Sequence, residues 1–243
     1  MKYGESAFDI LYLLFAVCVG IVILCRRKDK IGKLMGFATL ILGCGDAFHL
    51  VPRVLNYFID ADFTMWLGIG KFVTSITMTV FYLLLYRLWL LAYGKRENRA
   101  FGIAVYALGA IRVILCLLPQ NGWFENESSV VWGILRNIPF VALGAMIVYL
   151  FFKSRKAIRD FRFVWLLVSL SFLFYIPVAV AAPLVPMLGM LMLPKTICYM
   201  ILIGVFLYYN KTRAFDRSRF IHEERTRHIL FRSFERRFCG NKH

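Results

Sequence analysis

The sequence predicts an all-α membrane protein, a polytopic bundle of seven transmembrane helices. Three observations carry this prediction. The 243-residue chain is 60% hydrophobic, whereas a soluble domain is typically about 45–50% apolar. Seven separate segments are long and apolar enough to cross a bilayer core, which needs about 20 residues of helix. The lysines and arginines gather in alternate connections between these segments.

Short connections join the seven segments, so we expect one transmembrane domain over residues 1–209. The first segment begins behind a single lysine and lacks a small-residue cleavage site, which favours a retained helix over a cleaved signal peptide. The predicted helices cover residues 7–25, 34–52, 64–87, 101–118, 130–152, 163–182 and 187–209.

Residues 210–243 form a basic amphipathic cytoplasmic tail in this interpretation. Phe231, Phe234 and Phe238 share one helical face, with arginines elsewhere around it. Such a helix would lie on the anionic lipids of the inner leaflet. The alternative is a flexible basic tail that serves only to orient the chain.

The basic residues predict the orientation in the membrane. Most of the 30 lysines and arginines fall on one side, in the connections 26–33, 94–99 and 153–162 and in the tail. The opposite connections, 53–63, 119–129 and 183–186, contain Arg53 as their one cation. The positive-inside rule therefore places the N-terminus outside and the C-terminus in the cytoplasm, and the plasma (cytoplasmic) membrane is the expected location. Because topology explains the net charge of +16, no nucleic-acid partner is expected.

Seven ionisable residues lie within or at the edges of the second to seventh predicted helices, and one of them, Arg87, belongs to the inner boundary. Such groups are costly in lipid and mark functional sites by default. At a helical rise of about 1.5 Å per residue, five of them fall at one level, about 9–12 Å below the outer boundary. These five, on five different helices, are Asp46, Lys71, Arg112, Arg136 and Lys195, and His49 lies one turn above Asp46.

Four cations at this level face one carboxylate, Asp46, so we expect water or an anionic ligand to meet the excess positive charge. The sequence thus predicts a binding protein (a transporter, receptor or sensor) with an outward-facing polar pocket. Its ligand would be an anionic small molecule or the headgroup of an anionic amphiphile. Ser75, Tyr175 and Tyr199 would complete the lining. The alternative is that each cation reaches separately to the outer headgroups.

A membrane-embedded enzyme is the other function that the sequence leaves open. Asp46 and His49 lie one turn apart on one helical face, and a carboxylate beside an imidazole is the first half of an acid–base pair. The enzyme would act, in a hydrolase-like manner, on an outer-leaflet lipid, with the cations stabilising the developing charge. We favour the binding protein because the sequence offers no identifiable nucleophile.

No metal or cofactor is expected. His49 is the single histidine in the predicted helices, so the three-histidine zinc site of seven-helix ceramidases cannot be assembled. The topology resembles that of rhodopsins, and Lys195 lies in the last helix, where a retinal Schiff base would form. However, Lys71 stands where microbial rhodopsins carry acidic counter-ions, which argues against retinal.

Overall fold

The structure is a computed structural model that describes residues 2–96, 98–124, 130–181 and 185–212. The helices are α1 (Lys2–Arg26), α2 (Lys30–Phe58), α3 (Thr64–Ala92), α4 (Arg99–Leu117), α5 (Val130–Ser154) and α6 (Val164–Ala181). Short 3₁₀ turns cover Pro119–Asn121, Arg159–Phe161 and Pro186–Leu191. The last helical stretch, Met187–Thr212, is called the seventh span below.

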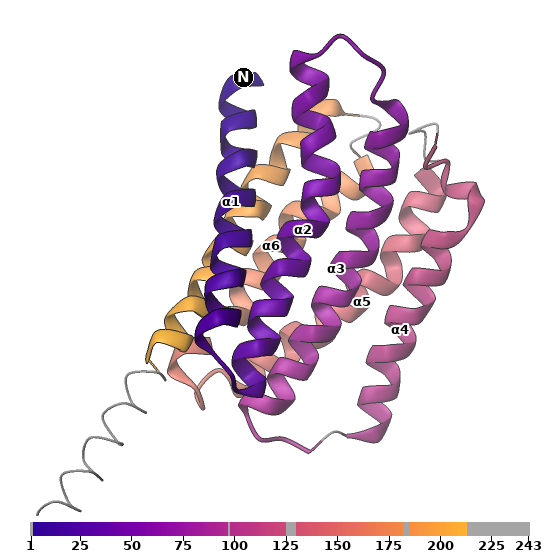
Figure 1. Cartoon of the computed structure of the whole chain (residues 1–243). Coiled ribbons are helices and arrows are strands. Elements are labelled where there is room, and N and C mark those ends of the chain that lie inside the picture. Colours follow the sequence, from indigo (N-terminus) through magenta and orange to yellow (C-terminus); the bar gives the residue numbers. More distant parts are fainter. Residues whose placement is uncertain (1, 97, 125–129, 182–184, 213–243) are drawn as a thin grey trace, which may run out of the picture.

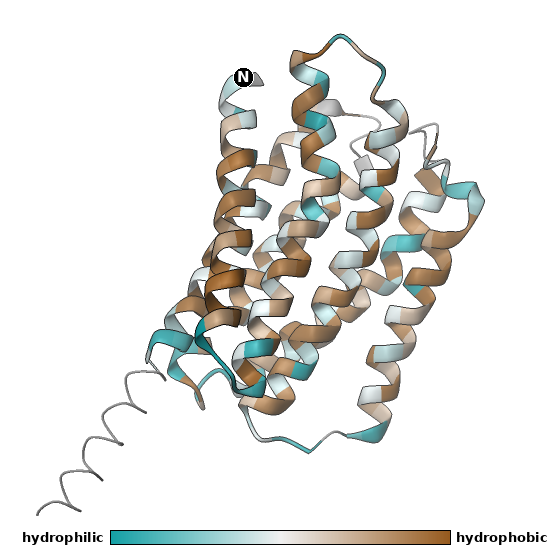
Figure 2. Ribbon diagram, in the orientation of Figure 1, coloured by the Kyte–Doolittle hydropathy of each residue, from teal (hydrophilic) through white to brown (hydrophobic). Residues whose placement is uncertain are grey.

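The chain folds into an all-helical bundle with seven helices long and apolar enough to cross a membrane. This confirms the helical fold class and fits a membrane protein. The helices run up and down beside one another (Figure 1), and their flanks are largely apolar (Figure 2). Most helices extend past their predicted ends: α2 and α3 each have 29 residues. The tail predicted for residues 210–243 lies outside the described residues from position 213 onward.

Helix α3 contacts α2, α4 and α5 and so forms much of the centre of the bundle. Its Phe81, Tyr82 and Leu85 are fully buried. Tyr82 lies edge-on to Phe140 of α5, with ring centroids 5.1 Å apart, and contributes a hydroxyl to the polar interior described below. The core is therefore aromatic rather than purely aliphatic at the level of Tyr82.

Glycine brings α2 and α3 close together beside the candidate site. A Cβ on Gly70 of α3 would lie 2.7 Å from the Cα of His49 and would also collide with the Phe48 carbonyl oxygen. The missing side chain lets the two backbones pack closely, as small residues do between membrane helices. This approach holds His49 against the first turns of α3.

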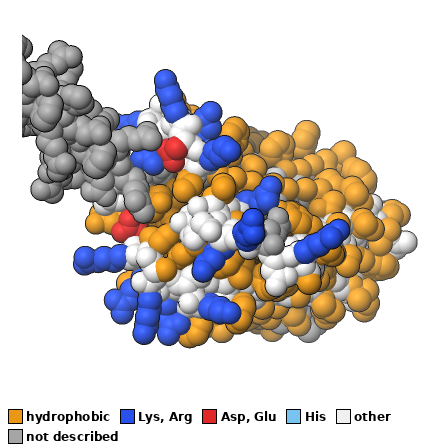
Figure 3. Space-filling view, turned by 90° about the horizontal axis from the view of Figure 1, so that it is seen from below, with side chains coloured by type: hydrophobic (Ala, Val, Ile, Leu, Met, Phe, Trp, Pro, Cys, Tyr) orange, Lys and Arg blue, Asp and Glu red, His pale blue; other side chains and the backbone are white. Residues whose placement is uncertain are grey.

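The two ends of the bundle differ in charge. We call the end where α1 begins the amino-terminal end; α2 also joins α3 there (Figure 1). Seen from the opposite end, lysine and arginine side chains surround the helix ends (Figure 3). The structure thus places the basic connections together, as the alternating charge pattern predicts for one side of a membrane.

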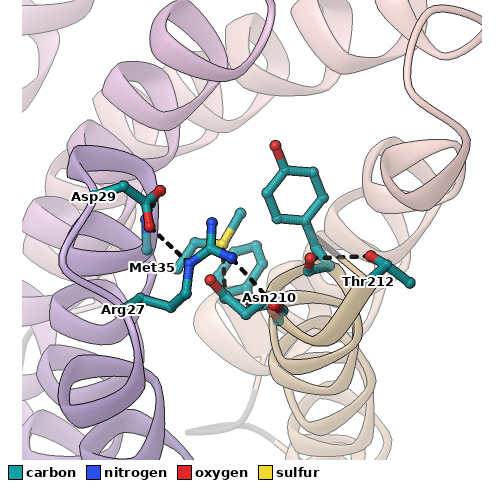
Figure 4. A network of polar contacts seen from close by, with 8 residues as sticks. Arg27, Asp29, Met35, Asn210 and Thr212 are labelled. Atoms are coloured by element: carbon teal, nitrogen blue, oxygen red, sulfur yellow. Dashed lines mark hydrogen bonds and ion pairs between the residues drawn. The ribbon is translucent and has the colours of Figure 1, made fainter. Parts of the chain in front are cut away.

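A polar network at this basic end ties the α1–α2 connection to the end of the seventh span (Figure 4). Arg27 Nε donates to Asp29 Oδ1 at 2.6 Å, and Arg27 Nη1 donates to the Asn210 carbonyl at 3.3 Å. Asp29 also accepts from Gly32 N at 3.2 Å as the N-cap of α2. The hydrogen bond from Arg27 holds the pKa of the Asp29 carboxyl below its ordinary value. The first and last helices are therefore linked at this end.

Candidate functional site

A layer of polar side chains crosses the amino-terminal half of the bundle. Its acidic part lies between α1 and α2. Tyr12 Oη donates to Asp46 Oδ2 at 2.6 Å, and Asp9, 4% exposed, interacts electrostatically with Asp46. Closer to the amino-terminal end, Arg53 forms an ion pair with Glu5. Carboxylates on α1 and α2 thus line one side of the layer.

His49 lies in the middle of the layer and is faced by two lysines. The imidazole interacts electrostatically with Lys71 of α3 and Lys195 of the seventh span, and forms a hydrogen bond with the Leu67 backbone. Its Nδ1 is buried and has no hydrogen-bond partner among the described residues. Lys71 is exposed, whereas Lys195 is partly buried. Positive charge therefore approaches His49 from two helices.

Lys195 is held by aromatic rings. Its Nζ lies 4.7 Å from the Tyr175 ring centroid and 5.7 Å from that of Tyr199. It also interacts electrostatically with Asp46. Cation–π contacts of this kind contribute about 0.5–2 kcal/mol each. The ammonium group is oriented by these rings and keeps hydrogen-bonding capacity for another acceptor.

The two tyrosines near Lys195 belong to a wider hydroxyl and amide network. Tyr199 Oη lies 3.1 Å from Tyr82 Oη, and Tyr175 Oη donates to Asn137 Oδ1 at 2.7 Å. Tyr82 Oη is also 3.4 Å from Ser171 Oγ. These contacts join α3, α5, α6 and the seventh span through polar groups in the interior.

Arg112 of α4 points into the bundle. It is 2% exposed and is the largest of the fully buried side chains, which is the opposite of a residue that reaches the headgroups. Its guanidinium carbon lies 3.4 Å from the Phe140 ring centroid. The Nε and Nη1 atoms have no hydrogen-bond partner among the described residues. The guanidinium group therefore has N–H donors available for another acceptor.

Arg136 of α5 organises the connection after α4. Its Nη1 donates to Asn121 Oδ1 at 2.9 Å, and its guanidinium carbon lies 4.3 Å from the Trp123 ring. Asn121 in turn donates to the carbonyls of Leu115 and Leu118 at 2.7 and 2.8 Å. Arg136 thus fixes the carboxyl end of α4, a contact that its position in the sequence does not indicate.

The remaining predicted lining residue, Ser75, donates to the Lys71 carbonyl at 2.8 Å. This bond lies within α3 and is the usual local bond of a helical serine. The structure therefore brings Asp46, His49, Lys71 and Lys195 together, and connects Tyr175 and Tyr199 to them. Arg112 and Arg136 interact electrostatically with each other, and Arg136 also interacts with Lys71.

The postulated acid–base pair is not formed in this structure. Asp46 accepts its hydrogen bond from Tyr12 of α1, and among the described residues no hydrogen bond joins it to His49. No group of three or more histidine, cysteine, aspartate or glutamate side chains in the described residues could hold a metal ion.

Two hollows lie on the bundle, and the first of them borders the Arg136 end of this layer through Trp123. One, of about 350 Å³, lies between α3 and the connection after α4, beside Phe72, Cys116 and Trp123. The other, of about 380 Å³, lies between α5 and α6, beside Val148, Phe152 and Trp165. Both are lined mainly by apolar side chains, and neither contains a predicted site residue.

The polar face that α1 contributes to this layer was not predicted from the sequence. Glu5, Asp9 and Tyr12 recur at spacings of four and three, which puts them on one helical face. That spacing was available in the sequence and could have identified the face that α1 turns toward Asp46. The partnership of Arg136 with Asn121 offered no such signal, because it joins a helix to a connection.

Comparisons of the chain with protein-family models, with curated proteins and with solved structures give no match.

Proposed function

We propose that this chain is an integral membrane binding protein that holds an anion at its amino-terminal end, between α2, α3 and the seventh span. The ligand would be a small oxyanion or the oxyanion headgroup of an amphiphile. In this proposal the amino-terminal end faces outward and the basic end faces the cytoplasm, because cytoplasmic connections carry the excess of lysine and arginine.

One observation carries the proposal: two lysines on different helices face a partly buried imidazole whose buried Nδ1 has no hydrogen-bond partner among the described residues. Lys71 and Lys195 both interact with His49, whose Nδ1 has no partner among the described residues. Neighbouring cations repel one another, so an arrangement of this kind is stabilised by a counter-charge. An oxyanion would accept hydrogen bonds from both ammonium groups. It would also favour a protonated imidazole, which can donate from Nδ1 while the other ring nitrogen keeps its bond to the Leu67 backbone.

The geometry gives less support to an enzyme. Proton transfer by an Asp46–His49 pair would require the two side chains to interact directly, but Asp46 accepts from Tyr12 instead. The binding proposal requires no group beyond the two lysines and His49.

Binding to the purified protein in phosphatidylcholine nanodiscs tests this function. Radiolabelled dodecyl phosphate and inorganic phosphate serve as probes, and empty nanodiscs serve as the blank. A hydrogen bond to a charged group contributes about 1.5–3 kcal/mol, and 1.4 kcal/mol is tenfold in affinity. We therefore expect Lys195→Gln and Lys71→Gln each to weaken binding of the preferred probe about tenfold.

Lys153→Gln is the matched control, because Lys153 is an exposed lysine at the opposite end, and it should bind like the wild type. Saturable binding of dodecyl phosphate alone identifies an amphiphile, and binding of both probes identifies the phosphate group itself. Equal affinity in all variants, or no saturable binding of either probe, would contradict the proposal. Release of inorganic phosphate from dodecyl phosphate would favour the enzyme.

A further inference from the structure

A second polar site lies between α1 and α2, apart from the two lysines and His49 of the proposed anion site. Ser6, Asp9 and Tyr12 follow one another at spacings of three residues on one face of α1. All three are buried, with exposed fractions of 3%, 4% and 0%. Tyr12 donates to Asp46 Oδ2 of α2 at 2.6 Å. The face therefore brings three buried polar groups of α1 toward a carboxylate of α2.

Two of these groups have unfilled hydrogen-bonding capacity. Asp9 Oδ2 and Ser6 Oγ are buried and have no hydrogen-bond partner among the described residues. A buried polar atom without a partner costs about 1–3 kcal/mol, and a charged one costs more. Because Ser6 and Asp9 lie one turn apart on the same face, one bound species can satisfy both.

The charges around the site indicate what that species is. Asp9 has a like charge, Asp46, as its electrostatic neighbour. Asp46 in turn faces Lys195 and the Tyr12 hydroxyl, and His49 lies one turn farther along α2. Lys195 is thus the one cation that acts on this pair of carboxylates among the described residues. The pair is one positive charge short of neutrality.

We propose that Asp9, Asp46 and Ser6 bind one small monovalent cation, H⁺ or Na⁺, between α1 and α2. A proton on Asp9 would neutralise that carboxylate and remove its repulsion from Asp46. A sodium ion would supply the same charge to the carboxylate and hydroxyl oxygens. This site and the proposed anion site share the charge of Lys195, but the cation uses neither Lys71 nor the His49 imidazole, so it can bind whether or not an anion does.

The unfolding temperature of the purified full chain tests the proposal. It is measured at about pH 8 in NaCl and in choline chloride of equal ionic strength, and again in choline chloride at about pH 5.5. A species that binds the folded state stabilises it. Relative to Asp9→Asn, we expect the wild type to gain about 3 °C or more, from Na⁺ at the higher pH if the site takes sodium, or from acid if it takes a proton.

Asp9→Asn is neutral and removes the charge that the cation would meet. It should unfold at least as high as the wild type at about pH 8, and it should lack the part of the response to Na⁺ or acid that depends on Asp9. His49 remains in this variant, so its own titration affects both proteins and cancels in the comparison. Asp60→Asn, at an exposed carboxylate between α2 and α3, is the control and should respond like the wild type. An Asp9→Asn variant that responds to Na⁺ and to acid like the wild type would overturn the proposal.

Discussion

Arg136 has a structural role at the edge of the layer of polar side chains. Its guanidinium group already binds Asn121 and lies over the Trp123 ring. The carboxyl end of α4 depends on Asn121, which donates to carbonyls of that helix. Arg136 therefore stabilises the connection between α4 and α5, whereas Lys195, held by aromatic rings, keeps donors for a ligand.

This division of roles makes Arg136→Gln a stability variant. Loss of the charged hydrogen bond should cost about 2 kcal/mol, which corresponds to a fall of roughly 4–8 °C in unfolding temperature for a chain of this size. Phosphate-probe affinity should stay within about threefold of the wild type. Thermal unfolding and equilibrium binding of the same preparation check both expectations. A large loss of affinity at unchanged stability would show that Arg136 binds the ligand.

Gly68 of α3 packs against the connection between α4 and α5, at Trp123. A Cβ at this position would overlap the Trp123 carbonyl oxygen, and backbone atoms cannot move away as a flexible side chain can. We expect Gly68→Ala to destabilise the bundle by about 1–3 kcal/mol, as other overpacking substitutions do.

Gly204→Ala is the control for that variant, because a Cβ on Gly204 would meet nothing within 4 Å. Its unfolding temperature should equal or exceed that of the wild type, since alanine favours helix over glycine. If the two variants unfold at the same temperature, the close contact between α3 and Trp123 is not formed in solution.

At the scale of elements, Asp29 begins α2 and links it to α1. Asp29→Ala removes the N-cap, which typically contributes about 1 kcal/mol, whereas Asp29→Asn keeps an N-cap oxygen and removes the charge.

The pKa of Asp29 is lowered in the folded state. Its charge therefore stabilises the fold above pH 3.8, the ordinary pKa of the group, and this contribution disappears as the pH falls below 3.8. Denaturation at neutral and acid pH should show Asp29→Ala as the less stable variant, and Asp29→Asn should lose less stability on acidification than the wild type. Equal acid sensitivity of Asp29→Asn and the wild type would contradict the role of the ion pair.

The helices themselves could be predicted because a span of about 20 apolar residues is a long and unmistakable pattern. Their ends were less predictable. Glu5 lies outside the predicted helix 7–25, but α1 includes it, and α1 turns Asp9 toward Asp46. The partners of Arg112 and Arg136 also could not be predicted, because Phe140 and Asn121 meet them only after α4 and α5 have packed together. Depth along a helix follows from the sequence, but the neighbour across an interface follows from the fold.

At the scale of the whole molecule, the basic end predicts the orientation in the membrane. Single cysteines at Ala61 and Lys156, both exposed positions, are introduced after the native cysteines have been replaced. Ala61→Cys should react with an impermeant thiol reagent on intact cells, and Lys156→Cys should react only after permeabilisation. The reverse pattern would place the amino-terminal end inside the cell and contradict an outward-facing site.

The central claim is that an anion binds beside His49, between Lys71 and Lys195. The most direct test is an experimental structure of the protein in nanodiscs saturated with dodecyl phosphate. We predict density for the phosphate group within hydrogen-bond distance of Lys195 Nζ and close to His49 Nδ1, with Lys71 on its other side. A phosphate group bound only among the cations of the opposite end, or an empty space beside His49 under saturating conditions, would contradict this account.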